Sequence, residues 1–391
     1  MTSVDRNAPT RPTRLNAPIH QPVLKVLGLG GGGGNAVDRM IELGISGVDF
    51  IVANTDKQAL ARSNAPVRIQ LGPKSTRGLG AGGNPSVGQK AAEESWRELG
   101  AALAGADMVF LTAGMGGGTG TGSIPIATQI AKKIGAVAIA VVTTPFSFEM
   151  GRRQKNANEG LEKLRKHTDT LISIPNDRLL HIAPKDLPLD TAFRLADDVL
   201  RQAVQSITEL ITEPGLINID FAHIRRLMKL GGGALMTMGQ AHGVNKALEA
   251  VKQALHHPLL DNISIHHAAG IIANFTAGSD LTLMEVSSAL NYLQERTNTH
   301  TEIVMGTTVD NSMDDRVQVI LVVTGLGATP IEEVFPGTEQ RFTESFTQPQ
   351  PQKIPAQPNP DEVRRIPQVA AATSNLDIPA FMRRQPRYAG S

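Results

Sequence analysis

The feature that most constrains the fold is an alternation of short apolar runs with longer helical patterns between residues 23 and 174. Each run is apolar at successive positions rather than at every second one, which is typical of strands buried on both faces. Such strands, separated by helices, form parallel sheets covered by helices. We therefore predict a Rossmann-like α/β domain, with strands at residues 23–27, 50–53, 108–113, 136–143 and 170–174 and helices at residues 35–43, 87–103, 124–134 and 154–167.

A long helix separates this region from a second unit. In residues 192–212 the apolar positions cover most of the helix circumference, which predicts a central core helix buried between two bodies. Asp190 or Thr191 is predicted to cap its start, and Pro214-Gly215 to end it. The patterns beyond it predict a second, smaller α/β domain, with strands at residues 271–275, 302–308 and 317–324 and helices at residues 224–228, 247–255 and 283–296.

The two ends of the chain differ from its body. Residues 1–22 are punctuated by proline, and residues 336–391 hold nine of the 24 prolines, so neither stretch is predicted to fold alone. The predicted organisation is a disordered arm, a nucleotide-binding domain, a central helix, a C-terminal domain, a disordered linker and a terminal peptide, at residues 1–22, 23–189, 190–213, 214–335, 336–374 and 375–391.

Composition excludes several classes of protein. The chain has no cysteine, so it has no disulfide framework, thiolate metal site or thiol nucleophile. No run of about 18 apolar residues is present, so we expect no membrane span and a cytoplasmic protein. The body is mildly acidic and aromatic residues make up 4%, which disfavours nucleic-acid binding. No metal site is predicted at the histidine pairs 256–257 and 266–267, because adjacent side chains diverge.

The first of two glycine-rich loops follows the first predicted strand. Residues 28–35 (GLGGGGGN) precede a helix, and glycine lets backbone amides approach a phosphate closely. The spacing Gly28-x-Gly30-x-x-Gly33 also fits the dinucleotide fingerprint. This loop by itself therefore leaves an NAD-linked oxidoreductase open.

The second loop favours a different ligand. Residues 114–123 (GMGGGTGTGS) follow the strand at 108–113 and offer backbone amides with the hydroxyls of Thr119 and Thr121. Two such cradles at the ends of neighbouring parallel strands suit one polyphosphate better than a nicotinamide cofactor. Residues 72–75 (GPKS) lack the upstream glycine of a Walker loop. The sequence predicts a nucleoside triphosphate site of non-Walker type.

Residues 116–122 (GGGTGTG) resemble the signature of the tubulin superfamily, and other stretches resemble the bacterial FtsZ family. These stretches are residues 54–56 (NTD), 78–85 (GLGAGGNP), 145–149 (PFSFE), 174–177 (IPND) and 214–218 (PGLIN). The resemblance covers residues 23–335 and the terminal peptide. It implies a cytoskeletal GTPase that polymerises head to tail into filaments of the bacterial division ring.

The resemblance also implies which residues contact the nucleotide. GTP or GDP would bind with an associated Mg²⁺ held mainly by phosphate and water rather than by protein ligands. Glu149 and Arg153 would contact ribose and phosphate, and the Asp198 carboxylate would accept from guanine. The implied set is Gly31, Gly32, Gly33, Gly34, Asn35, Ala36, Asp56, Gly116, Gly117, Gly118, Thr119, Gly120, Thr121, Glu149, Arg153, Asn176, Phe193 and Asp198.

In this family a loop of the next subunit completes the active site. Here the loop reads residues 218–226 (NIDFAHIRR), in which Asn218 and Asp220 match and His223 stands at the second acidic position. A carboxylate accepts hydrogen bonds at neutral pH, whereas imidazole accepts only when it is neutral. The resemblance implies Asp220, Asn218 and His223 as the catalytic set in the neighbouring subunit's site, with His223 as a departure from the family's pattern. A nucleotide-binding filament or regulatory paralogue with weak hydrolysis stays open.

The last segment contains a short apolar island, residues 375–384 (NLDIPAFMRR). Its apolar side chains recur at helical spacing after a capping aspartate, a pattern that favours helix-in-groove binding. It resembles the FtsZ C-terminal peptide, which implies membrane-tether and ring-regulator proteins as partners and a location at the division site. The predicted partner-binding residues are Asp377, Ile378, Pro379, Phe381, Met382 and Arg383.

Overall fold

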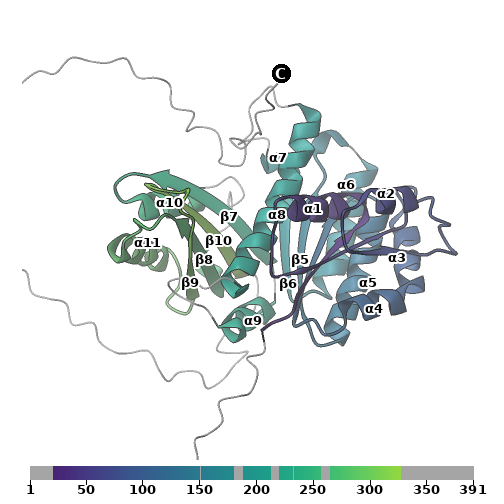
Figure 1. Cartoon of the computed structure of the whole chain (residues 1–391), viewed down its shortest axis with the longest axis horizontal. Helices are drawn as coiled ribbons and strands as arrows, with labels where there is room; N and C mark the ends of the chain where they lie inside the picture. The colour runs from purple at the N-terminus through teal and green to yellow at the C-terminus, as the bar shows by residue number, and fades with distance from the viewer. Residues whose placement is uncertain are drawn as a thin grey trace, which may run out of the picture. The chain divides into compact units, whose positions relative to one another are not determined.

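The structure, a computed structural model, describes residues 21–149, 151–179, 188–212, 220–231, 233–256 and 265–326. Within these residues the strands form one ten-stranded sheet in the order β3-β2-β1-β4-β5-β6-β7-β10-β8-β9 (Figure 1). The first six strands are all parallel, which confirms the predicted α/β class. They are β1 (Leu24–Leu29), β2 (Asp49–Asn54), β3 (Val67–Gln70), β4 (Met108–Gly114), β5 (Val137–Thr144) and β6 (Thr170–Pro175).

Helices cover both faces of these six strands. One layer, in which α5 contacts α3, α4 and α6, packs on side chains such as Leu27 and Leu111. On the other face α1 contacts the core helix α8. The helices of this region are α1 (Gly30–Glu42), α2 (Lys57–Arg62), α3 (Pro85–Glu94), α4 (Trp96–Leu103), α5 (Thr119–Lys133), α6 (Arg152–Arg165) and α7 (Asn176–Leu179), with a 3₁₀ turn, η1 (Ser147–Glu149).

Two helices differ from their predicted bounds. The predicted helix at 87–103 is two helices, α3 and α4, because Ser95 leaves the helical conformation and its Oγ accepts from the amide of Gly72 at 3.0 Å. The predicted helix at 35–43 begins five residues earlier, at Gly30. Its first turn lies against β4, since a Cβ on Gly33 would lie 2.2 Å from the carbonyl oxygen of Thr112.

The predicted central helix is confirmed as α8 (Leu189–Thr212), which lies between β5 and β9 and contacts both (Figure 1). Leu200, Ala203, Val204 and Ile207 are fully buried. The predicted N-terminal cap is wrong, because Asp190 and Thr191 lie inside the first turn, where Asp190 Oδ2 accepts from Arg194 Nε at 2.8 Å. The predicted end at Pro214-Gly215 lies outside the described residues.

The second α/β unit is mixed rather than parallel. β10 (Arg316–Leu326) runs antiparallel to β7 (Gly233–His242) and to β8 (Gly270–Ala277), while β9 (Glu302–Val309) runs parallel to β8. Its helices are α9 (Phe221–Lys229), α10 (Lys246–Leu255) and α11 (Leu283–Glu295), with a 3₁₀ turn, η3 (Ile265–His267). Strand β7, which the sequence pattern did not predict, pairs with β6 through two residues and joins the two parts of the sheet.

The predicted domain boundaries stay predictions. Residues 1–20 of the arm, the linker and the terminal peptide lie outside the described residues. In the part of the chain that the structure describes, no helix has the length and apolar character needed to cross a bilayer.

Candidate functional site

The two glycine-rich loops lie side by side at the carboxyl ends of two adjacent strands. β1 and β4 are adjacent parallel strands, paired as far as Leu29 and Ala113, so the loops follow the same end of both. A Cβ on Gly30 would lie 2.8 Å from the amide nitrogen of Gly120, and Gly30 has a φ of +71°. The predicted loops therefore form one continuous surface of closely packed backbone.

Within the second loop, Gly116 and Gly117 have different surroundings. Gly116 has a φ of +102°, its amide donates to Thr121 Oγ1 at 2.8 Å, and a Cβ there would lie 2.9 Å from the carbonyl oxygen of Arg153. A Cβ on Gly117 would meet nothing within 4 Å, and the same holds for Gly31 in the first loop. Both loops thus keep open space beside their backbone, which close approach of a phosphate to backbone amides requires.

Side chains from neighbouring segments hold the second loop in place. Thr119 Oγ1 lies 2.6 Å from Thr55 Oγ1, at the end of β2. Asn156 of α6 donates to the carbonyl oxygens of Gly116 and Gly83, both at 3.1 Å. Sequence reasoning missed Asn156, whose position on a polar helix gave no signal. This one amide joins the second glycine-rich loop to the loop that precedes α3.

The predicted contact Asp56 has a structural partner. Its Oδ1 accepts from the amides of Gln58, at 2.8 Å, and Ala59, at 3.3 Å, and so caps α2. Helix capping alone accounts for an aspartate at this position.

A cluster of aromatic rings lies close to the second loop, because a Cβ on Gly116 would lie 3.3 Å from Cγ of Pro145, the residue before Phe146. Phe146 stacks on Phe148 with ring centroids 5.0 Å apart and meets Phe193 of α8 edge-on at 5.5 Å. Phe193 and Phe148 remain 39% and 49% exposed. Exposed aromatic faces beside a polar loop are suited to stacking on a planar base.

Two polar side chains, Glu149 and Asn176, belong to the segments next to these rings. Glu149 forms an ion pair with Arg153, and its Oε1 accepts from the amide of Phe146 at 3.0 Å. Asn176, at the end of β6, is 5% exposed, and its Oδ1 has no hydrogen-bond partner among the described residues. A buried orphan acceptor indicates a missing donor. These groups fit a nucleotide whose base lies beside the aromatic rings.

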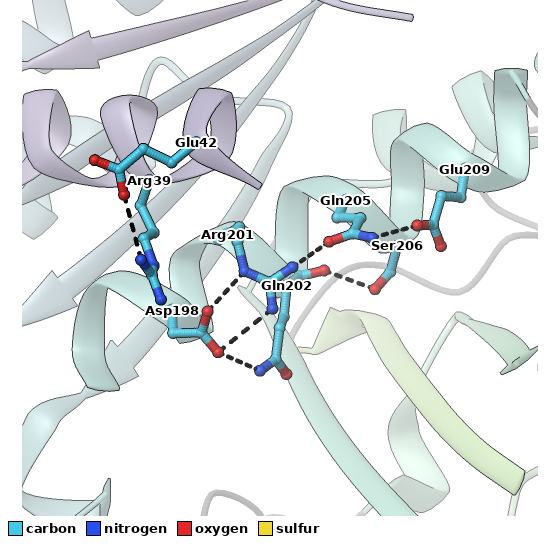
Figure 2. A network of polar contacts seen from close by, with 8 residues as sticks. All are labelled: Arg39, Glu42, Asp198, Arg201, Gln202, Gln205, Ser206 and Glu209. Atoms are coloured by element: carbon cyan, nitrogen blue, oxygen red, sulfur yellow. Dashed lines mark hydrogen bonds and ion pairs between the residues drawn. The ribbon is translucent and has the colours of Figure 1, made fainter. Parts of the chain in front are cut away.

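The two carboxylates of α8 near these rings differ in their partners. Asp198 Oδ1 accepts from Arg201 Nε, and its Oδ2 accepts from Gln202 Nε2, both at 2.7 Å; Figure 2 shows this network together with Arg39 of α1. Asp197 accepts no hydrogen bond from the residues that the structure describes. Burial, reinforced by the charge of Asp198, raises the pKa of Asp197 to about 7. Asp197 is therefore the carboxylate that has acceptor capacity to spare.

Asp220 and His223 lie at the opposite end of the first six strands. Asp220 is the N-cap residue of α9 and makes no side-chain capping bond. The other end of α9 is fixed to the start of β6, because Thr170 Oγ1 donates to the carbonyl oxygen of Met228. His223 Nε2 lies 3.5 Å from Glu302 Oε1 of β9. Asn218 and the terminal-peptide residues Asp377, Ile378, Pro379, Phe381, Met382 and Arg383 lie outside the described residues.

The described residues contain no cluster of three or more histidine, aspartate or glutamate side chains that could hold a metal ion. His257 and the side chain of His267 lie outside what the structure describes. A nucleotide-associated Mg²⁺ needs few protein ligands, because phosphate and water supply most of its coordination.

Comparison with known proteins gives matches along most of the chain. A tubulin/FtsZ family GTPase-domain model matches residues 23–184, and an FtsZ family C-terminal domain model matches residues 232–327. The structure of an empty FtsZ dimer from M. jannaschii aligns with a TM-score of 0.75 and 46% identity, over 78% of this chain and 89% of that chain. A mutant FtsZ from M. jannaschii aligns with the same score and identity, over 78% and 92%.

A more distant likeness concerns the fold alone. CetZ2 from Haloferax volcanii, in a GTPgS-bound protofilament, aligns with a TM-score of 0.67 over 80% of this chain and 96% of that chain, at 17% identity.

Proposed function

Because this chain belongs to the FtsZ family, we propose that it binds and hydrolyses GTP and polymerises head to tail into filaments of the bacterial division ring. The family match leaves the dehydrogenase interpretation of the first glycine loop without support. GTP binding and hydrolysis are activities of the GTPase domain that the family model describes.

The observation that carries this proposal is the position of Asp220 relative to the glycine loops. The loops follow the carboxyl ends of β1 and β4, whereas α9 is fixed at the amino end of the parallel strand β6. Six residues of strand span about 20 Å. Asp220 is thus held away from the phosphate site of its own chain.

The core helix α8 gives the same separation independently. Phe193, near its start, contacts the aromatic cluster, and α8 ends at Thr212, eight residues before Asp220 in the chain. A helix of 24 residues is about 36 Å long. Asp220 can therefore act on a nucleotide only in the next subunit, and a contact between unlike ends of identical subunits propagates into an open filament.

Within the pocket we assign the phosphates to the amides of residues 30–36 and 116–121, with Glu149 and Arg153 beside the ribose. The guanine would stack against Phe193 and take up the orphan acceptor of Asn176. Asp197, rather than Asp198, would accept from the guanine N1 and N2 donors, since both oxygens of Asp198 already accept from Arg201 and Gln202. When bound with the nucleotide, Mg²⁺ would neutralise phosphate charge during hydrolysis.

The rest of the function rests on the termini. The peptide at residues 375–384 would bind membrane-tether and ring-regulator proteins and so bring cytoplasmic filaments to the division site. Filaments present many peptides at once, and many weak contacts then act together.

The proposed function is tested by measuring phosphate release across protein concentration, with light scattering from the same samples. A shared active site requires that specific activity rise steeply at the concentration where polymer appears. Asp220→Ala should polymerise with GTP and release little phosphate. Activity independent of concentration, or equal activity in Asp220→Ala, would place hydrolysis within one subunit and overturn the head-to-tail site.

His223 favours one second candidate, a nucleotide-dependent filament with weak hydrolysis. The imidazole stands at an acidic position of the family's loop, and its Nε2 lies 3.5 Å from Glu302 Oε1 of its own chain. Polymer that forms with GTP and persists without phosphate release would identify this alternative.

A further inference from the structure

One carboxylate of β9 engages two side chains of α9. Glu302 Oε1 lies 3.5 Å from His223 Nε2 and also forms an ion pair with Arg226, one turn further along the helix. The Glu302 side chain is 22% exposed, and that of His223 is 47% exposed. The imidazole is therefore fixed on one side by a partly buried anion and open to solvent on the other.

This arrangement favours one position of the imidazole proton. Nε2 is the ring nitrogen that faces the Glu302 carboxylate, with Oε1 at 3.5 Å, and a carboxylate only accepts hydrogen bonds, so the contact favours hydrogen on Nε2. In a neutral imidazole the other nitrogen then has a lone pair. In that state His223 Nδ1 is an acceptor, like the carboxylate oxygen that the resemblance implies at this position. The Arg226 guanidinium balances the charge of Glu302.

We propose that Glu302 is a positioning residue for GTP hydrolysis, which holds His223 with Nδ1 available to accept a hydrogen bond from the attacking water in the next subunit's site. The inference rests on the proposed function. In the step itself, the water oxygen bonds to the γ-phosphorus while the bond to the bridging oxygen of GDP breaks. GDP keeps that electron pair, the water's proton ends on the released phosphate, and His223 orients the water without being consumed.

A double-mutant cycle on the full-length protein tests this role. Glu302→Gln, His223→Asp and the double variant are assayed for phosphate release per subunit at saturating polymer. Glu302→Gln alone should lower the rate at least about tenfold, because a catalytic histidine whose tautomer is no longer fixed by a carboxylate loses more than this in serine proteases. In the His223→Asp background the same substitution should change the rate less than about twofold, since a carboxylate needs no tautomer fixed. Equal fold-losses in both backgrounds would overturn the proposal.

Arg226→Gln is the matched control, because it removes the ion pair with Glu302 and leaves Glu302 beside His223. It should keep most of the activity that Glu302→Gln loses. A loss equal to that of Glu302→Gln would mean that Glu302 acts only by anchoring α9, and the proposal would be wrong.

The side-chain ¹⁵N shifts of His223 in the GDP-bound, unpolymerised protein give a readout that needs no hydrolysis. The wild type should show the Nε2–H tautomer, and Glu302→Gln should show a mixture of tautomers. A wild type with hydrogen on Nδ1 would contradict the inference even if GTPase activity is high. If the wild type shows the Nε2–H tautomer but neither it nor any variant hydrolyses GTP, the result would instead contradict the proposed function.

Discussion

Asp197 lies four residues beyond Phe193 on α8, so the two side chains share one face of the helix. Phe193 reaches the exposed aromatic cluster beside the glycine loops. Asp198, one position further, turns to a different face and binds Arg201 and Gln202 (Figure 2). Adjacent carboxylates on one helix therefore have different surroundings, and we assign them different tasks: guanine binding to Asp197 and stabilisation of the fold to Asp198.

Substitution of each carboxylate should separate these tasks. Asp197→Ala should weaken GTP binding by about 3 kcal/mol, or roughly 100-fold, through the loss of charge-assisted hydrogen bonds to guanine. Asp198→Ala should instead lower the free energy of unfolding by about 3 kcal/mol, because it leaves the partly buried Arg201 without its anion. Calorimetric titration with GTP and urea unfolding of both variants measure the two effects. The reverse pattern would return the guanine contact to Asp198.

GTP affinity should also depend on pH through Asp197. Its pKa is raised to about 7, so the free protein holds a proton there below pH 7, and guanine binding must displace it. Affinity should fall about tenfold between pH 7.5 and pH 6. Nucleotide phosphates titrate in the same range, so the GTP affinity of the wild type is compared at each pH with that of Asp197→Asn. The variant should lack the part of the pH dependence that comes from the Asp197 proton. Parallel profiles in both proteins would remove Asp197 from the guanine site.

The nucleotide-free protein should show the opposite dependence in its stability. Between pH 4 and pH 7 the folded chain keeps the Asp197 proton, whereas the unfolded chain has released it. Rising pH therefore destabilises the fold by up to about 1.4 kcal/mol per pH unit from this group, with no further change above its folded pKa. Urea unfolding of the wild type against Asp197→Asn, at pH 5 and pH 7.5, isolates the effect. A difference between the two proteins that does not change with pH would contradict the buried proton.

The sequence predicts the architecture of the first domain because its strands are continuous apolar runs, such as residues 108–113. It did not predict β7, whose residues include two glycines and two methionines. That strand depends on pairing with β10 and on close contact with α10, where a Cβ on Gly239 would lie 1.9 Å from the carbonyl oxygen of Ala250. Short elements such as α2 and β3 likewise lack a periodic signal of their own.

The site was predictable in part for the same reason. Each glycine-rich loop follows a predicted parallel strand, so both loops were expected at the carboxyl ends of the strands. The structure brings the two loops into contact there. The choice between Asp197 and Asp198 depends on the side-chain conformations that join Asp198 to Arg201 and Gln202 of the same helix, and on the burial of Asp197. The spacing of four from Phe193 was nevertheless an available signal. Glu302 could not be found from the sequence, because 76 residues separate it from Arg226.

Removal of residues 377–391 should leave GTP binding and polymerisation unchanged and abolish recruitment to membranes. The predicted linker, residues 336–374, has 39 residues and a flexible reach on the order of 35 Å, so the peptide is expected to act apart from the filament core. Fluorescence localisation in cells and sedimentation with GTP measure the two properties. Unchanged localisation would place the tether elsewhere, with the basic arm at residues 1–22 as the next segment to delete.

Three glycine substitutions should separate backbone strain from phosphate contact. Gly116→Ala meets both a positive φ and the Arg153 carbonyl, so it should lose stability and GTP affinity together. Gly117→Ala meets no atom within 4 Å, so it should keep its stability and lose affinity alone, because its methyl group occupies the space left for phosphate.

Gly105→Ala provides the matched control for strain, since Gly105 has a φ of +75° and a Cβ there would meet no atom within 4 Å. Gly105 precedes β4, so it lies at the end of that strand opposite the second glycine-rich loop. It should lose about 1 kcal/mol of stability and bind GTP normally. Urea unfolding and GTP titration on all three variants distinguish the effects. If Gly117→Ala binds GTP as tightly as the wild type, the open space beside Gly117 does not receive phosphate, and the phosphate must then be assigned to the amides of the first loop.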